Sequence, residues 1–182
     1  MNGSAPRDHV DRLREQWARE LPDLDTTPMG VLGRIHRLAN LVRPGIEATF
    51  AGFGLDRGEF DVIATLRRSG PPYRLTPTEL YRSLMISSGG LTHRLDRLER
   101  AGLIRRERSP SDGRSFHIAL TPRGRDRAEA AFRADMAAEA RVLAAMAPQQ
   151  RAALAELLRE LLLIREAAAP ADTGEDRAGL SR

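Results

Sequence analysis

Residues 87–125 read SSGGLTHRLDRLERAGLIRRERSPSDGRSFHIALTPRGR, and the order of features in this stretch predicts the fold. Leu91, Leu95 and Leu98 recur at helical spacing and mark the buried side of a helix, and Gly102 stands where that helix is expected to end. Two short runs of alternating apolar residues follow, separated by residues 109–113, SPSDG, whose composition favours a hairpin loop. An amphipathic helix followed by an arginine-bearing hairpin is the order of a winged helix-turn-helix.

The rest of the chain predicts helices on both sides of this unit. Apolar periodicity and Thr-Pro helix starts predict helices over residues 8–21, 28–53, 57–69, 77–83, 88–101, 122–146 and 148–168, the second interrupted near Pro44 and the fifth capped by Ser87 or Ser88. We expect a mainly α fold with a small β-wing, in these segments: an extra N-terminal helix (1–27), a dimerisation or linker helix (28–54), the winged helix-turn-helix (55–121), C-terminal dimerisation helices (122–168) and a disordered tail (169–182). The last helix has more leucines than the small central unit can cover, which predicts a homodimer.

Composition restricts the possible classes of function. The 182 residues contain no cysteine, and the four histidines lack metal-ligand spacing, so we expect no disulfide, no thiolate chemistry and no metal. No apolar run approaches a membrane span and no signal-peptide pattern occurs, which predicts a cytoplasmic protein without a membrane partner. The net charge of +4 is uneven, because residues 56–125 carry +6 and the remainder −2. A basic excess on the helix and hairpin indicates double-stranded DNA as the partner.

The helix at 88–101 and its hairpin supply the candidate DNA contacts. The predicted DNA-binding residues are Ser87, Ser88, Thr92, His93, Arg97, Arg108 and Arg114. The serines precede a helix, where backbone N–H groups favour a phosphate, and Arg97 lies opposite the leucine face, where it could bind guanine. The two hairpin arginines flank the loop and could enter a minor groove, with Asp112 orienting Arg114 by an ion pair. The alternative interpretation is a solvated charged surface.

One arginine of this helix is placed differently. Arg94 lies about 60° around the helix from Leu91, at the edge of the buried face. A buried guanidinium needs an anion, and Asp61, within an otherwise apolar helix, is the candidate. Two interpretations remain open: a structural ion pair, or a ligand cleft in which an anion competes for Arg94 and shifts the helix.

The chain resembles the MarR family of bacterial transcriptional regulators over roughly residues 28–168. The resemblance is carried by residues 91–99 (LTHRLDRLE), 101–104 (AGLI), 112–114 (DGR) and 120–124 (LTPRG). It implies a dimer that binds palindromic DNA and releases it when a small ligand binds.

A narrower resemblance is to the urate-responsive, PecS-like branch of that family. It rests on Trp17 in the extra N-terminal helix, on Phe60-Asp61-Val62, on Arg94 and on Arg106. It implies that Trp17, Asp61, Arg94 and Arg106 line or support a pocket for urate or a related purine anion. From its apolar neighbours alone, Trp17 is better explained as a core anchor than as a ligand contact. Arg106 is equally well explained as a DNA contact of the wing and as a residue of the cleft.

These observations predict a ligand-responsive DNA-binding regulator, a repressor, that has no cofactor and releases its operator when it binds a small anion. The alternative is a winged-helix protein–protein adaptor that binds an acidic protein and no operator. An enzyme is the weakest option, because catalysis needs paired groups in a cleft, and Asp61 has no nucleophile or metal partner in the sequence.

Overall fold

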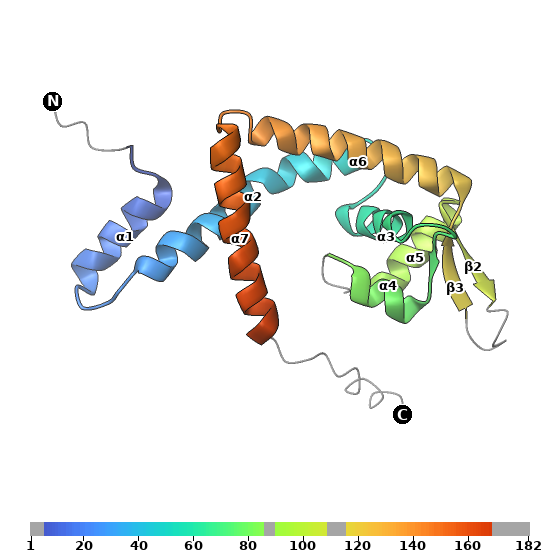
Figure 1. Cartoon of the computed structure of the whole chain (residues 1–182), viewed down its shortest axis with the longest axis horizontal. Helices are drawn as coiled ribbons and strands as arrows, with labels where there is room; N and C mark the ends of the chain where they lie inside the picture. The colour runs from blue at the N-terminus through green and yellow to red at the C-terminus, as the bar shows by residue number, and fades with distance from the viewer. Residues whose placement is uncertain (1–5, 86–89, 109–115, 169–182) are drawn as a thin grey trace. The chain divides into compact units, whose positions relative to one another are not determined.

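The computed structural model describes residues 6–85, 90–108 and 116–168, and it divides into two compact units after Glu139. The first unit contains α1 (His9–Glu20), α2 (Thr27–Ala51), α3 (Arg57–Arg68), β1 (Arg74–Leu75), α4 (Pro77–Ser83), α5 (Leu91–Arg100), β2 (Ile104–Arg108), β3 (Phe116–Leu120) and most of α6 (Pro122–Val142). The second contains the end of α6 and α7 (Pro148–Ala168). The fold is mainly helical with a small sheet, as the sequence predicts (Figure 1).

Reciprocal side-chain caps explain where three of the helices begin. In each, the capping side chain accepts a hydrogen bond from the backbone N–H three residues later, and the side chain of that residue accepts one from the N–H of the cap. The pairs are Asp8 with Asp11 at α1, Asp56 with Glu59 at α3, and Thr76 with Glu79 at α4.

Two helices depart from the sequence prediction. α2 runs through Pro44 without a break, because Ile46 and Phe50 in its second half pack on the core and keep the helix in place. α5 starts at Leu91, and its N-cap is Gly90 with a positive φ of 76°, so the prediction that Ser87 or Ser88 caps this helix is wrong. Both serines lie outside the described residues.

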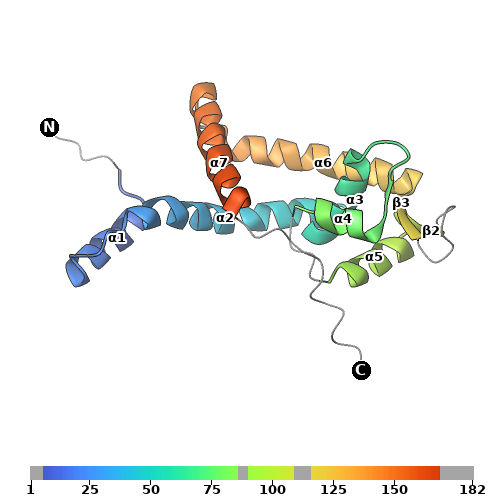
Figure 2. The ribbon, with the colours of Figure 1, turned by 60° about the horizontal axis from the view of Figure 1, so that its bottom comes forward.

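The core of the first unit centres on α3. Its residues Val62, Ile63 and Leu66 have no exposed surface, and α3 lies between α6 and the α4–α5 pair (Figures 1 and 2). Leu80 of α4 and Leu98 of α5 complete the packing from the other side. The recognition-helix candidate α5 is therefore set directly on α3.

The wing is a three-stranded antiparallel sheet in the order β1-β3-β2. It continues into α6 through a tight joint, where a Cβ on Gly124 would lie 1.9 Å from the Leu103 carbonyl oxygen. Thr121 Oγ1 accepts a hydrogen bond from the Gly124 N–H at 3.0 Å and donates one to the Gly102 carbonyl at 2.8 Å. The end of α5, the wing and the start of α6 are thereby joined at one point.

The remaining helices are α1, which packs on α2, and α7, which exposes apolar surface. α1 packs on α2 through Val10, which is buried, and through Arg34, whose guanidinium binds Asp8 at 2.8 Å and Asp11 at 2.6 Å. None of the residues of α7 is buried, and its exposed apolar side chains are Leu154, Leu157, Leu158, Leu162, Leu163 and Ile164. Within the described ranges, no helix combines the length and the hydropathy needed to cross a bilayer.

Candidate functional site

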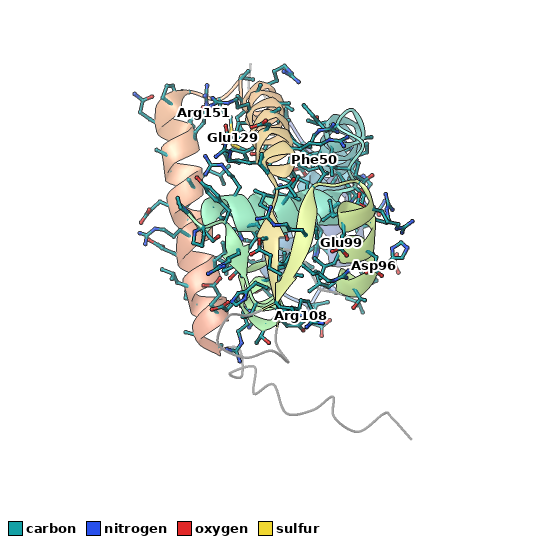
Figure 3. The ribbon with its side chains drawn as sticks, turned by 90° about the vertical axis from the view of Figure 1, so that its right-hand side faces the viewer. Phe50, Asp96, Glu99, Arg108, Glu129 and Arg151 are labelled. Atoms are coloured by element: carbon teal, nitrogen blue, oxygen red, sulfur yellow. The ribbon has the colours of Figure 1, made fainter. Side chains whose placement is uncertain are left out.

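The outer surface of α5 and the end of the wing keep part of the predicted DNA-binding set accessible. Thr92 and His93 are exposed on α5, and Arg108 is exposed at the end of β2 (Figure 3). The predicted contacts Ser87, Ser88 and Arg114, and the orienting residue Asp112, lie outside the described residues. Contacts of all these residues with DNA stay predictions.

Arg97 is exposed on α5, as the helical projection predicts, but its guanidinium is also bound to α3. Its Nε lies 2.8 Å from Glu59 Oε1 and its Nη1 lies 3.6 Å from Asp56 Oδ2, at the start of α3. The Glu59 side chain is only 3% exposed, and it also accepts the capping hydrogen bond from the Asp56 N–H at 2.8 Å. A projection of α5 alone contains no neighbouring helix, so it could not predict these ion pairs with α3. A contact between Arg97 and a base stays a prediction.

Arg106 joins the wing to α5. Its Nη2 lies 2.6 Å from Asp96 Oδ1, its Nη1 contacts Glu99, and its backbone N–H donates to Glu99 Oε1 at 3.1 Å. Both acidic residues lie on the α5 ribbon beside β2 (Figure 3). The hydrogen bond to Asp96 is the largest influence that raises the pKa of Arg106. Two ion-pair groups, one on each side, therefore hold α5: Arg97 with α3 and Arg106 with β2.

A cavity of about 940 Å³ lies between α3 and α6. Its apolar lining consists of Phe60, Ala64, Met85, Ala128, Phe132 and Met136. Its charged lining consists of Asp61, Arg67, Arg68, Glu129, Arg133, Asp135 and Glu139. A large pocket that presents both apolar surface and polar groups can orient a small molecule, and charged residues make up about half of this lining.

Two α3 residues of the cavity wall hold the chain that leads to α5. Asp61, which is 6% exposed, accepts a hydrogen bond from the Met85 N–H at 2.9 Å, and Arg68 donates to the Ser83 carbonyl. Arg68 also lies 3.9 Å from Asp61. The wall of the cavity is thus bonded to the end of α4, a few residues before the recognition-helix candidate.

The four residues expected to form one ligand pocket do not all meet in the single chain. Asp61 lines the cavity, whereas Trp17, Arg94 and Arg106 are not among its lining residues. Trp17 is 47% exposed on α1, so within one chain it does not anchor the core either. Arg94 packs over Gly58, where an added Cβ would lie 2.2 Å from Arg94 Nε, and Arg68, on the same helix as Asp61, lies 3.9 Å from that carboxylate.

Sequence reasoning missed Asp135. It is 6% exposed and continues the buried stripe of α6 that Gly124, Ala128 and Ala131 begin. Its Oδ1 has no hydrogen-bond partner among the described residues. Burial raises the pKa of Asp135, and burial and then the charge of Asp135 raise that of Glu139. The available signal was an acid at helical spacing among small residues, which is too weak a stripe to stand out in an alanine-rich helix.

Comparison with known proteins identifies the family. A model of the MarR family matches residues 53–115. The transcriptional regulator PecS of Dickeya dadantii is 44% identical over 115 residues, which are 63% of this chain and 69% of PecS.

Two solved structures share the fold. Sco3205 of Streptomyces coelicolor, a MarR family regulator solved in complex with DNA, is 25% identical with a TM-score of 0.68, over 81% of this chain and 91% of that one. The MarR family protein Rv2887 of Mycobacterium tuberculosis, solved with p-aminosalicylic acid, is 30% identical with a TM-score of 0.58, over 72% and 97% of the two chains. Since these relatives are regulators, neither the adaptor nor the enzyme hypothesis is retained. The chain belongs to the MarR family of DNA-binding transcriptional regulators.

Proposed function

We propose that the protein is a repressor that binds a palindromic operator as a homodimer and releases it when urate or a related purine anion occupies the α3–α6 cavity. PecS supports the branch, at 44% identity, and the Rv2887 complex shows that a relative binds a small aromatic molecule. As a bacterial transcriptional regulator that binds DNA, the protein would act in the cytoplasm.

The observation that carries this proposal is the bonding of the cavity wall to the end of α4. Asp61 and Arg68 face the cavity and also hold the backbone at Met85 and Ser83. A ligand that takes up hydrogen bonds from either side chain competes with those backbone contacts. The helix-turn-helix geometry then shifts, and the affinity for DNA falls by the free energy that couples the two sites.

The homodimer is supported by the unpartnered apolar surface. On α7, Leu157 is 64% exposed and Ile164 is 66% exposed. Apolar surface of this extent on a soluble chain usually marks an interface. Two winged units related by a twofold axis would bind half-sites about one helical turn, roughly 34–36 Å, apart.

A gel-shift series on the DNA upstream of the protein's own gene tests the proposal. We expect a shifted band that weakens steeply with salt, because phosphate contacts release counterions, and weakens further with urate. Arg108→Ala should reduce the affinity, whereas Arg43→Ala on α2, with the same change of charge outside the winged unit, should not. Asp61→Asn and Arg68→Gln should reduce the response to urate.

The outcomes separate the parts of the proposal. A wild-type protein that gives no specific band would refute operator binding at that site. A specific band that urate leaves unchanged, together with an unchanged thermal midpoint in urate, would refute urate as the effector while leaving the DNA-binding regulator in place.

A further inference from the structure

We propose that Asp135 is an effector-recognition residue: in the α3–α6 cavity it accepts a hydrogen bond from a ring N–H of a planar nitrogen heterocycle. This inference rests on the proposed effector role of that cavity. It adds a residue on α6 to the site, and it selects heterocycles with N–H donors over aromatic carboxylates.

Asp135 carries a free-energy cost in the folded chain. A buried acceptor without a partner costs free energy, and a buried carboxylate costs more than a neutral group. Asp135 stands in a stripe where Ala131 and Ala128 fill the equivalent positions one and two turns earlier, respectively. An alanine would therefore fit this stripe without that cost. A polar group that destabilises the fold and borders a cavity is typical of a binding site.

The shape and polarity of the space beside Asp135 restrict the kind of ligand that fits. Phe60, Phe132 and Met136 contribute apolar surface to the lining, and such surface favours a flat aromatic ring. The ring's polar edge must then match the groups around it. The two buried carboxylates of the lining are Asp61 and Asp135. Because Asp61 already accepts a hydrogen bond from the Met85 N–H, we assign the ring edge to Asp135, which can only accept while it is ionised.

The arginines of the cavity restrict where an anionic oxygen of the ligand can bind. Arg67 is bound to Glu129 at 2.8 Å and lies over the Tyr73 ring, and Arg68 is bound to the Ser83 carbonyl near Asp61. Both α3 guanidinium groups thus already have acceptors. Exposed Arg133 lies on the same lining. A ring with N–H donors on one edge and an anionic oxygen on another matches Asp135 and Arg133 together, whereas an aromatic carboxylate presents no ring N–H to Asp135.

Calorimetric titration of the full-length protein with urate, xanthine and salicylate tests this inference, alongside the gel shift. In Asp135→Ala we expect urate and xanthine affinity to fall about tenfold or more, equivalent to about 1.4 kcal/mol. Salicylate affinity should not fall, operator affinity without effector should be unchanged, and the thermal midpoint should be equal or higher. Asp126→Ala, the same substitution at an exposed site of α6, should match the wild type throughout.

Results of three kinds would overturn the inference. The first is urate and xanthine binding that Asp135→Ala leaves unchanged, or a wild type that binds salicylate but neither heterocycle. The second is a lower thermal midpoint in Asp135→Ala, which would show a structural role. The third is a change in the monomer–dimer equilibrium by analytical ultracentrifugation without a change in ligand affinity, which would show that Asp135 serves a second copy. If the wild-type protein gave no specific operator band in the gel shift, that result would instead refute the proposed function.

Discussion

Substitution of Glu59 by glutamine tests whether α5 is positioned by its ion pair with α3. Glutamine keeps a side-chain oxygen for the capping hydrogen bond from Asp56, but it removes the charge that binds Arg97. Breaking a fully buried pair costs about 3–5 kcal/mol, and breaking an exposed pair about 0–1 kcal/mol. Here one side chain is 3% exposed and the other 45%. We therefore expect Glu59→Gln to lower the free energy of unfolding by about 1–2 kcal/mol.

Urea denaturation and a double-mutant cycle measure this effect. For a chain of 182 residues, the expected loss lowers the thermal midpoint by roughly 2–8 °C. Arg97→Gln should cost more than Glu59→Gln, because it leaves a buried carboxylate without this partner. The double variant should lose less than the sum of the two, with a coupling of about 1 kcal/mol.

Operator binding distinguishes positioning from base recognition. If Arg97 positions α5, both single variants should weaken binding to the operator and to its single-base-pair variants by the same factor. If Arg97 instead contacts a guanine, Arg97→Gln should remove the preference at one base pair while Glu59→Gln leaves it in place. That result, or strictly additive losses of stability, would refute the positioning argument.

Two further predictions concern other contacts of the first unit. Gly124→Ala should lower the free energy of unfolding by roughly 3 kcal/mol, at the upper end of overpacking costs, because its Cβ would lie 1.9 Å from the backbone oxygen of the residue before β2. Gly45→Ala, with no atom within 4 Å of the added Cβ, is the control, and equal urea midpoints for the two variants would contradict the reasoning. At α1, the Asp11 N–H and then Arg34 lower the pKa of Asp8, and Arg34 is the first cause that lowers the pKa of Asp11. Because both pKa values are lower in the folded chain than the ordinary value of 3.8, the two ionised carboxylates stabilise the α1–α2 contact at pH values above 3.8. This stabilisation is lost as the pH falls through the lowered pKa values. The fluorescence of the single tryptophan, on α1, should therefore change on acidification in the wild type and less in Arg34→Gln; identical profiles would exclude the contact as the cause.

Local signals in the sequence were sufficient for the elements of the fold. The Thr-Pro pairs placed the starts of α2, α4 and α6 to within a residue, because proline in the first helical turn acts locally. At α4 and α6 the threonine side chain also accepts a capping hydrogen bond, whereas α2 has no side-chain cap. The apolar spacing of α5 identified its buried face, where Leu95 and Leu98 are buried. These signals are strong because neighbours along the chain produce them.

The contacts of the candidate site were harder to predict from the sequence, because they join residues that are far apart in the chain. Arg97 and Glu59, 38 positions apart, meet on facing helices, and Arg106 reaches back from β2 to Asp96 and Glu99. The helical projection of α5 placed Arg97 opposite the leucine face, but it contains no information about the carboxylates on neighbouring elements.

The sequence by itself determined the order of helices and wing, the basic excess of the DNA-binding segment and the family, since all three depend on local pattern or on residue identity. The tertiary structure decided that Arg97 and Arg106 form ion pairs with carboxylates of neighbouring elements, whereas Arg108 is exposed at the end of β2. It also decided that Asp61 and Asp135, on two helices distant in the chain, share one cavity. These outcomes depend on how α3 packs against α5 and α6, and only packing brings an arginine or a carboxylate to its partner or leaves it facing an open space.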